Sequence, residues 1–129
     1  YLINKKYNIF IVSNQAGIGK GIFSNSDFFN LHLKLKNYLQ NKDIYFNDVQ
    51  YSPFHPKAKI KKYRKKSQTR KPGNLMIENI KSKWDIDLRR SFMIGDNITD
   101  KIAAKKSKLK FFYSEKNFLN QVRKIINNY

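Results

Sequence analysis

Ile9-Phe10-Ile11-Val12-Ser13-Asn14 is the stretch that decides the fold. Its apolar run is short and continuous, ends at a polar pair and is followed by glycines, which is typical of a buried parallel strand. Ser91-Phe92-Met93-Ile94-Gly95-Asp96 repeats this pattern near the other end of the chain. Each stretch therefore predicts a buried strand that is followed directly by polar or acidic side chains.

Helical and extended segments alternate around these two strands. Apolar residues recur at helical spacing between Ser24 and Asn41, and Ser24 with Asp27 is a candidate capping box. Further strands are expected at residues 49–51 and 109–113, and further helices at residues 75–84, 99–106 and 117–126. This alternation predicts an α/β fold with a doubly wound parallel sheet, in one domain over residues 1–129. Such sheets bind ligands at the carboxyl ends of their strands.

The strong positive charge has two interpretations. The chain carries 27 Lys and Arg against 9 Asp and Glu, a formal net charge of +18, and nine of the basic residues lie between Lys57 and Lys71. A basic surface attracts nucleic acid through counterion release. However, Lys far outnumbers Arg, the residue suited to bidentate phosphate recognition. We favour compositional drift, do not expect a nucleic-acid partner, and interpret residues 57–71 as an exposed loop.

Composition also bears on the cellular location of the protein and on the types of site it can contain. The absence of cysteine excludes disulfides and thiolate metal sites, and agrees with a cytoplasmic location. No apolar run approaches the roughly 18 residues needed to cross a bilayer, so no membrane partner is expected. The chain begins with neither Met nor a signal-peptide pattern, and we expect its reading frame to extend upstream.

Two stretches carry chemistry, but neither is decisive by itself. Ser13 to Gly21 fails both the Walker A and the dinucleotide patterns, which leaves a structural turn or a set of donors to phosphate oxygens. Asp96 suits a Mg²⁺ ligand, and Asp100, four residues later, could hold either the ion or the lysine in place. Alternatively, Asp96 and Thr99 could cap a helix.

Four motifs in this order resemble the phosphatases of the haloacid dehalogenase (HAD) superfamily. They are Val12 to Gly21, Ser52-Pro53-Phe54-His55-Pro56, Arg70-Lys71-Pro72 and Ser91 to Asp96. Within that superfamily they resemble the D-glycero-D-manno-heptose 1,7-bisphosphate 7-phosphatases and the histidinol-phosphate phosphatases. The resemblance implies hydrolysis of a phosphate monoester on a phosphorylated sugar, with one Mg²⁺ ion as cofactor.

The resemblance also implies a role for each matching residue. Asp96 would bind Mg²⁺, and Asp100 would support the site. Phosphoryl transfer depends on positioning and charge neutralisation, which the catalytic pair of Ser13 and Lys71 would provide. Substrate contacts are expected from Asn14, Gln15, Ala16, Arg70 and Asn97.

Two departures from the family qualify this prediction. The family opens with a strand and an Asp-x-Asp motif, whereas no acidic residue precedes Ile9. We therefore expect the sheet to lack its first strand, the chain alone to be inactive, and a missing N-terminal segment or chain to supply the nucleophile. At the positions where many relatives bind zinc stand Ser52, Phe54, Ser67 and Thr69. These are poor zinc ligands, so we expect no zinc and a loop that is ordered by packing.

Other functions stay open at this point. The chain could be a catalytically dead fragment or half of a split protein. It could also be a nucleic-acid-binding module or a polynucleotide 3′-phosphatase.

Overall fold

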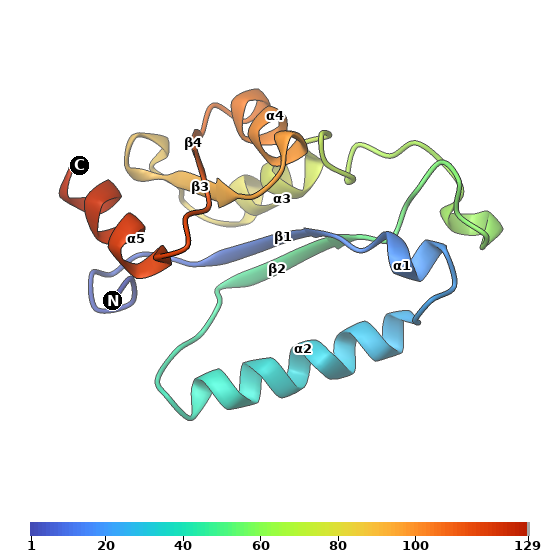
Figure 1. Cartoon of the computed structure of the whole chain (residues 1–129), viewed down its shortest axis with the longest axis horizontal. Helices are drawn as coiled ribbons and strands as arrows, with labels where there is room; N and C mark the ends of the chain where they lie inside the picture. The colour runs from blue at the N-terminus through green and yellow to red at the C-terminus, as the bar shows by residue number, and fades with distance from the viewer. Residues whose placement is uncertain (129) are drawn as a thin grey trace. The chain divides into compact units, whose positions relative to one another are not determined.

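The computed structural model describes residues 1–128 and forms two compact units, Tyr1–Arg70 and Lys71–Tyr129. We call them the N-terminal unit and the C-terminal unit and describe each by itself (Figure 1).

A parallel strand pair is the frame of the N-terminal unit. Strand β1 (Phe10–Asn14) pairs with β2 (Asp48–Ser52), in a register that runs from Phe10 opposite Asp48 to Asn14 opposite Ser52. The crossover between them contains the short helix α1 (Ala16–Gly19) and the longer helix α2 (Asn25–Gln40). Because the strands are parallel, Asn14 and Ser52 end at the same edge of the pair.

Helix α2 begins at the predicted cap. The Ser24 hydroxyl accepts the Asp27 amide at 3.0 Å, and the Asp27 carboxylate accepts the Ser24 amide at 2.8 Å, which confirms the capping box. The helix runs alongside β1 and β2 (Figure 1), and the rings of Phe28 and Tyr51 lie 4.4 Å apart between their centroids. Aromatic packing therefore attaches α2 to the strand pair.

The basic segment was predicted as an exposed loop, and that prediction is only partly right. Its lysines are mostly exposed, but Ala58 and Tyr63 are buried with Ile18 of α1 in a small apolar core. The 3₁₀ helix η1 (Lys61–Tyr63) lies in this segment, and the Ile60 amide donates to the Gly19 carbonyl at 3.0 Å. The segment folds back because burying an alanine and a tyrosine ring outweighs the cost of ordering a basic loop.

The C-terminal unit contains a second parallel pair. Strand β3 (Phe92–Gly95) pairs with β4 (Lys110–Tyr113), and the crossover helix α4 (Ile98–Lys106) packs against both strands. The remaining elements are α3 (Leu75–Lys83), η2 (Leu88–Arg90) and α5 (Phe118–Asn127). The buried apolar side chains of this unit lie on its α-helices: Met76, Ile77, Ile80, Ala103, Ala104, Val122 and Ile125.

Parallel strands joined by helical crossovers confirm the α/β class. The predicted helices and strands are all present, with ends that differ by about two residues or fewer, as is usual where helix ends fray. The sequence patterns do not predict α1, η1 and η2, each only one turn long. None of the helices in residues 1–128 has both the length and the apolarity that a bilayer crossing requires.

The burial of Ile18 yields a prediction for the stability of the N-terminal unit. Ile18 is 1% exposed, whereas Ile22, four residues later, is 73% exposed. Ile18→Ala should lower the free energy of unfolding by about 2–5 kcal/mol, because it leaves a cavity in a small core. The matched variant Ile22→Ala should change it by less than about 0.5 kcal/mol. Chemical denaturation of both variants tests this, and equal effects would contradict the assigned core.

Candidate active site

The end of β3 presents the acidic residues of the C-terminal unit. Asp96 follows the strand and is exposed, and Asn97 is the N-cap of α4, with its side-chain oxygen accepting the Thr99 amide at 3.3 Å. Asp100 closes a capping box, because its Oδ2 accepts the Asn97 amide at 3.0 Å. Capping by Asp96 and Thr99, the alternative from the sequence, is therefore wrong. Asn97 and Asp100 perform it instead, and the Asp96 carboxylate lies outside the cap.

An ion pair joins Lys71 to Asp100. The Lys71 Nζ lies 2.6 Å from Asp100 Oδ1, and the two side chains are only 11% and 6% exposed. Burial raises the pKa of Asp100, but hydrogen bonds from Lys71 and from the Asn97 and Asp96 amides, with the lysine charge, outweigh it. The net effect holds the pKa of Asp100 below its ordinary value of 3.8. Asp100 is thus an ionised acceptor whose oxygens hold both the lysine and the first turn of α4.

Gly95 makes room for this arrangement. A Cβ atom at Gly95 would lie 2.6 Å from Asp100 Oδ2 and 2.7 Å from its Cβ. Any side chain at this position would therefore push Asp100 away from Lys71. The last residue of β3 is constrained by the packing of Asp100 against the backbone.

In the N-terminal unit, strand β1 ends with Ser13 and Asn14, and helix α1 begins at Ala16 after the linking residue Gln15. The side-chain amide of Gln15 donates to Ser13 Oγ at 2.8 Å, and the backbone amide of Gln15 donates to the Ser52 carbonyl at 2.8 Å. Because a hydroxyl has one proton and two lone pairs, Ser13 keeps its proton for another acceptor. The structure thus brings these four residues together at the carboxyl edge of the strand pair.

The glycines after Ser13 serve close packing. A Cβ atom added at Gly17 would lie 2.2 Å from the Phe23 ring. One added at Gly19 would lie 2.5 Å from the Pro53 carbonyl oxygen. The segment forms helix α1, and its glycines let it approach Phe23 and Pro53. The structural role of this stretch is therefore established by its contacts.

Arg70 lies at the end of the basic segment. Its guanidinium Nη1 donates to the Phe54 carbonyl at 3.4 Å, and its amide donates to the Ser67 carbonyl at 3.1 Å. Desolvation, followed by the charges of Arg70, Lys20 and Lys57, lowers the pKa of His55. Cationic groups therefore gather around His55, in a field that favours an anionic ligand.

Lys20 and His55 were not among the predicted site residues. Lys20 lies inside the motif Val12 to Gly21 and His55 inside the motif Ser52 to Pro56, but their separation in the chain conceals that the charge of Lys20 acts on His55. The four positions compared with a zinc site are held by other contacts. Three of them, Ser52, Ser67 and Thr69, are joined by hydrogen bonds, and the ring of Phe54 packs 5.8 Å from that of Tyr63. Hydrogen bonding as well as packing thus orders this loop.

The side chains that could serve as metal ligands fit a magnesium ion only in part. Asp96 offers hard oxygen ligands of the kind that Mg²⁺ prefers, whereas Asp100 is already bound to Lys71. Within residues 1–128 no cluster of three His, Cys, Asp or Glu side chains could hold an ion. Further ligands would have to come from groups outside such a cluster, such as backbone carbonyls, water or another segment.

One Asp-x-Asp tripeptide is present, Asp85-Ile86-Asp87, but it precedes β3 instead of following a strand. Asp87 caps η2 by accepting the Arg89 amide at 3.0 Å, and it forms an ion pair with the Arg89 side chain at 3.2 Å. These contacts give the tripeptide a structural role.

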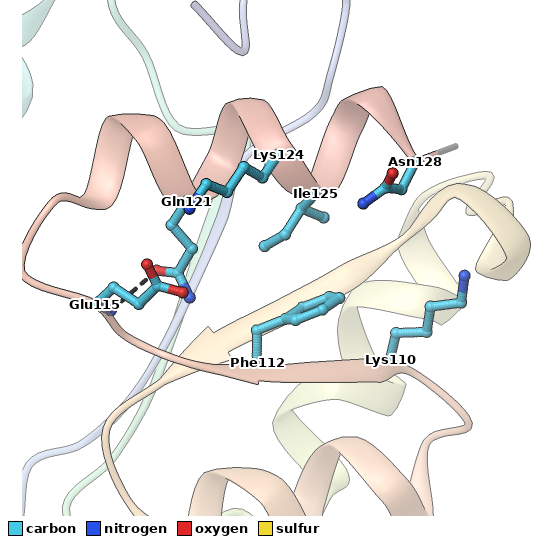
Figure 2. A pocket seen from close by; sticks show the side chains of 7 residues that line it. All are labelled: Lys110, Phe112, Glu115, Gln121, Lys124, Ile125 and Asn128. Carbon is cyan, nitrogen blue, oxygen red and sulfur yellow. Dashed lines mark hydrogen bonds between the residues drawn. The ribbon is translucent and has the colours of Figure 1, made fainter.

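A cavity of about 220 Å³ lies between β4 and α5, as Figure 2 shows. Gln121 bridges its wall, donating to the Tyr113 carbonyl at 2.6 Å and accepting the Glu115 amide at 3.0 Å. A second cavity, of about 250 Å³, lies between α2 and residues 44–51. Neither is lined by a predicted site residue, so the candidate groups are those at the strand ends of each unit taken by itself.

Comparison with known proteins agrees with the motifs. Residues 68–113 match the family described as HAD-hydrolase-like. The D-glycero-beta-D-manno-heptose-1,7-bisphosphate 7-phosphatase of Rhodopseudomonas palustris is 37% identical over 99 residues, which are 77% of this chain and 55% of the relative. The D-glycero-alpha-D-manno-heptose-1,7-bisphosphate 7-phosphatase of Burkholderia mallei is 36% identical over 94 residues, 73% of this chain and 50% of the relative. The chain thus spans about half the length of these curated relatives.

Solved structures show the same fold. A crystal structure of a D,D-heptose 1,7-bisphosphate phosphatase from B. bronchiseptica, complexed with magnesium and phosphate, superimposes with a TM-score of 0.75 at 20% identity. The match covers 95% of this chain and 65% of that one. A HAD-like phosphatase from Mesorhizobium loti gives a TM-score of 0.76 at 24% identity, over 83% of this chain and 51% of that one. By sequence, this chain is similar to HAD-like hydrolases and to heptose bisphosphate phosphatases, and it shares the fold of the two solved phosphatases.

Proposed function

We propose that this chain forms the phosphate-binding part of a Mg²⁺-dependent phosphatase that removes the 7-phosphate of D,D-heptose 1,7-bisphosphate. The buried Lys71–Asp100 ion pair is the observation that carries the proposal. It is supported by the names of the relatives, which describe 7-phosphatases of this sugar bisphosphate. The nucleophile is to come from a segment or chain that carries Asp-x-Asp after a strand.

Lys71 is the charge-neutralising group of the proposed reaction. Asp100 fixes its ammonium group at a distance of 2.6 Å, and the backbone of α4 fixes Asp100 in turn. A cation that is already oriented stabilises the charge on a transferring phosphoryl group without reorganising during the reaction. Asp100 thus acts through Lys71 and does not bind the ion itself.

Ser13 and Arg70 are the proposed donors of the N-terminal unit. The proton of the Ser13 hydroxyl would bind a phosphoryl oxygen, with Gln15 holding the oxygen of that hydroxyl in position. Arg70 offers a planar donor suited to a second anionic group, and its charge acts together with that of Lys20 at His55. Asn14, Ala16 and Asn97 are proposed to contact the substrate from the strand ends.

Asp96 is the proposed Mg²⁺ ligand of this chain. A bound Mg²⁺ would neutralise charge on the phosphoryl oxygens and orient them. Asp96 is exposed at the end of β3 and outside the helix cap, so its oxygens can serve as ligands.

Two variants test the proposal in a form of the protein that carries the nucleophile segment. Lys71→Ala and Asp96→Ala should each reduce phosphate release from the heptose bisphosphate by about 100-fold or more, because each removes charge stabilisation from the reacting group. The assay measures release with and without Mg²⁺. Lys81→Ala is the matched control, since Lys81 pairs with Glu78 on the surface of α3. Wild-type turnover by either site variant would refute these roles.

Gly95→Ala tests how the lysine is held. The added methyl group should displace Asp100 and release Lys71, so phosphate release should fall and stability should drop by about 1–3 kcal/mol. Gly21→Ala is the comparison, because no atom lies within 4 Å and only the positive φ of 72° is strained. It should cost about 1–2 kcal/mol while leaving turnover unchanged. Full activity of Gly95→Ala would show that the ion pair is dispensable.

A further inference from the structure

Three hydroxyl side chains meet in the N-terminal unit. Thr69 Oγ1 lies at the centre, 3.0 Å from Ser52 Oγ and 2.8 Å from Ser67 Oγ. Ser67 Oγ also accepts the Thr69 amide at 3.2 Å. Ser52 has no exposed surface, so its hydroxyl relies on protein partners instead of water. We call Ser52, Ser67 and Thr69 the hydroxyl cluster.

The hydroxyl cluster joins two segments that are distant in sequence. Ser52 ends β2, whereas Ser67 and Thr69 end the basic segment immediately before Arg70. The hydrogen bond between Ser52 and Thr69 spans 17 positions. This bond is therefore the direct side-chain tie between the strand pair and the residue next to Arg70.

Ser52 also touches the other proposed substrate-binding segment. Its carbonyl accepts the Gln15 amide at 2.8 Å, directly after β1. On the other side, the Ser67 carbonyl accepts the Arg70 amide at 3.1 Å. Ser52 thus holds the Asn14–Ala16 turn through its backbone and the Arg70 turn through its side chain.

Cation–π contact gives the same loop a second, weaker attachment. The Lys65 Nζ lies 4.7 Å from the centroid of the Phe54 ring, and Arg70 binds the Phe54 carbonyl at only 3.4 Å. Both contacts involve flexible cationic side chains near the surface. The short bonds of the hydroxyl cluster are therefore better suited to fix the position of Arg70.

We infer that the hydroxyl cluster is a positioning device that holds Arg70 at a fixed distance from the Asn14–Ala16 turn. The cluster does not contact substrate; it sets how well Arg70 binds the anionic group of the substrate that is not transferred. This inference rests on the proposed function for the role of Arg70, but the order of the loop can be tested without it.

Thr69 offers a matched pair of variants. Thr69→Val keeps the shape and removes the hydroxyl, whereas Thr69→Ser keeps the hydroxyl and removes a methyl group. In the full chain, Thr69→Val should speed hydrogen exchange of the Arg70 amide by about tenfold or more, because local opening becomes easier. Thr69→Ser should stay close to wild type, and amides of β3 and β4 should not respond. Wild-type protection of the Arg70 amide in Thr69→Val would overturn the inference.

The positioning of Arg70 can be tested by steady-state kinetics, in the form of the protein that carries the nucleophile segment. Thr69→Val should raise KM for the heptose bisphosphate by about tenfold, the effect of one weakened charge-assisted hydrogen bond, and leave kcat nearly unchanged. Thr69→Ser should restore the wild-type KM. An unchanged KM, or a fall in kcat alone, would reject the positioning role.

Arg70→Ala distinguishes a failure of the proposed role of Arg70 in substrate binding from a failure of the inference about the hydroxyl cluster. It should raise KM at least as much as Thr69→Val does. If Arg70→Ala leaves KM unchanged, the proposed role of Arg70 in substrate binding is wrong, and with it the positioning function of the cluster. The exchange measurement would then still decide whether the hydroxyl cluster orders the loop.

Discussion

The buried ion pair between Lys71 and Asp100 is the interaction on which the C-terminal unit is organised. A carboxylate and an ammonium group that are both almost excluded from water stabilise the unit only when each is fully paired. Asp100 meets this condition with Lys71 on one oxygen and the Asn97 amide on the other. Removing either partner would leave a charge buried alone, so the pair constrains its neighbours.

That constraint reaches the backbone on two sides. Gly95 has no side chain because Asp100 occupies the space that a Cβ would need. Asn97 begins α4 because the same carboxylate accepts its amide. The strand end, the helix start and the lysine are thereby fixed by a single side chain. A cation fixed in this way suits the proposed phosphatase reaction, since charge stabilisation is effective when the groups are oriented in advance.

Much of this fold was predictable because its signals are local. The apolar run of β1, the Ser24–Asp27 cap and the helical spacing of α2 depend on neighbouring residues, and the structure confirms the strand, the cap and the helix. The expected burial of β1 and β3 is wrong, because all residues of both strands are only half-buried. The fold of residues 57–70 was not predictable, because the burial of Ala58 and Tyr63 depends on contact with Ile18 far along the chain. A run of lysines obscures two buried positions, since hydrophobic periodicity is weak in so short a segment.

The candidate site also has features that the sequence predicts and features that it does not. The motifs identified the residues at each strand end, but not all of their partners. That Asp100 holds the lysine was one of two roles expected for it, and the ion pair with Lys71, 29 positions earlier, confirms that role. No spacing rule predicts that Asn97 rather than Asp96 caps α4. The hydroxyl cluster has no signature in sequence either, because serine and threonine are common in loops. The roles of Ser13, Arg70 and Asp96 in substrate and metal binding stay predictions that rest on the family resemblance.

The pKa of Asp100 tests the central claim most directly. NMR titration of its side-chain carboxyl carbon should give a pKa below 3.8 in the wild-type chain, in keeping with the pairing to Lys71. Lys71→Met keeps the length of the side chain and removes its charge, so burial should then raise the pKa of Asp100 above the wild-type value. A wild-type pKa at or above 3.8, or the same pKa in both proteins, would contradict the account.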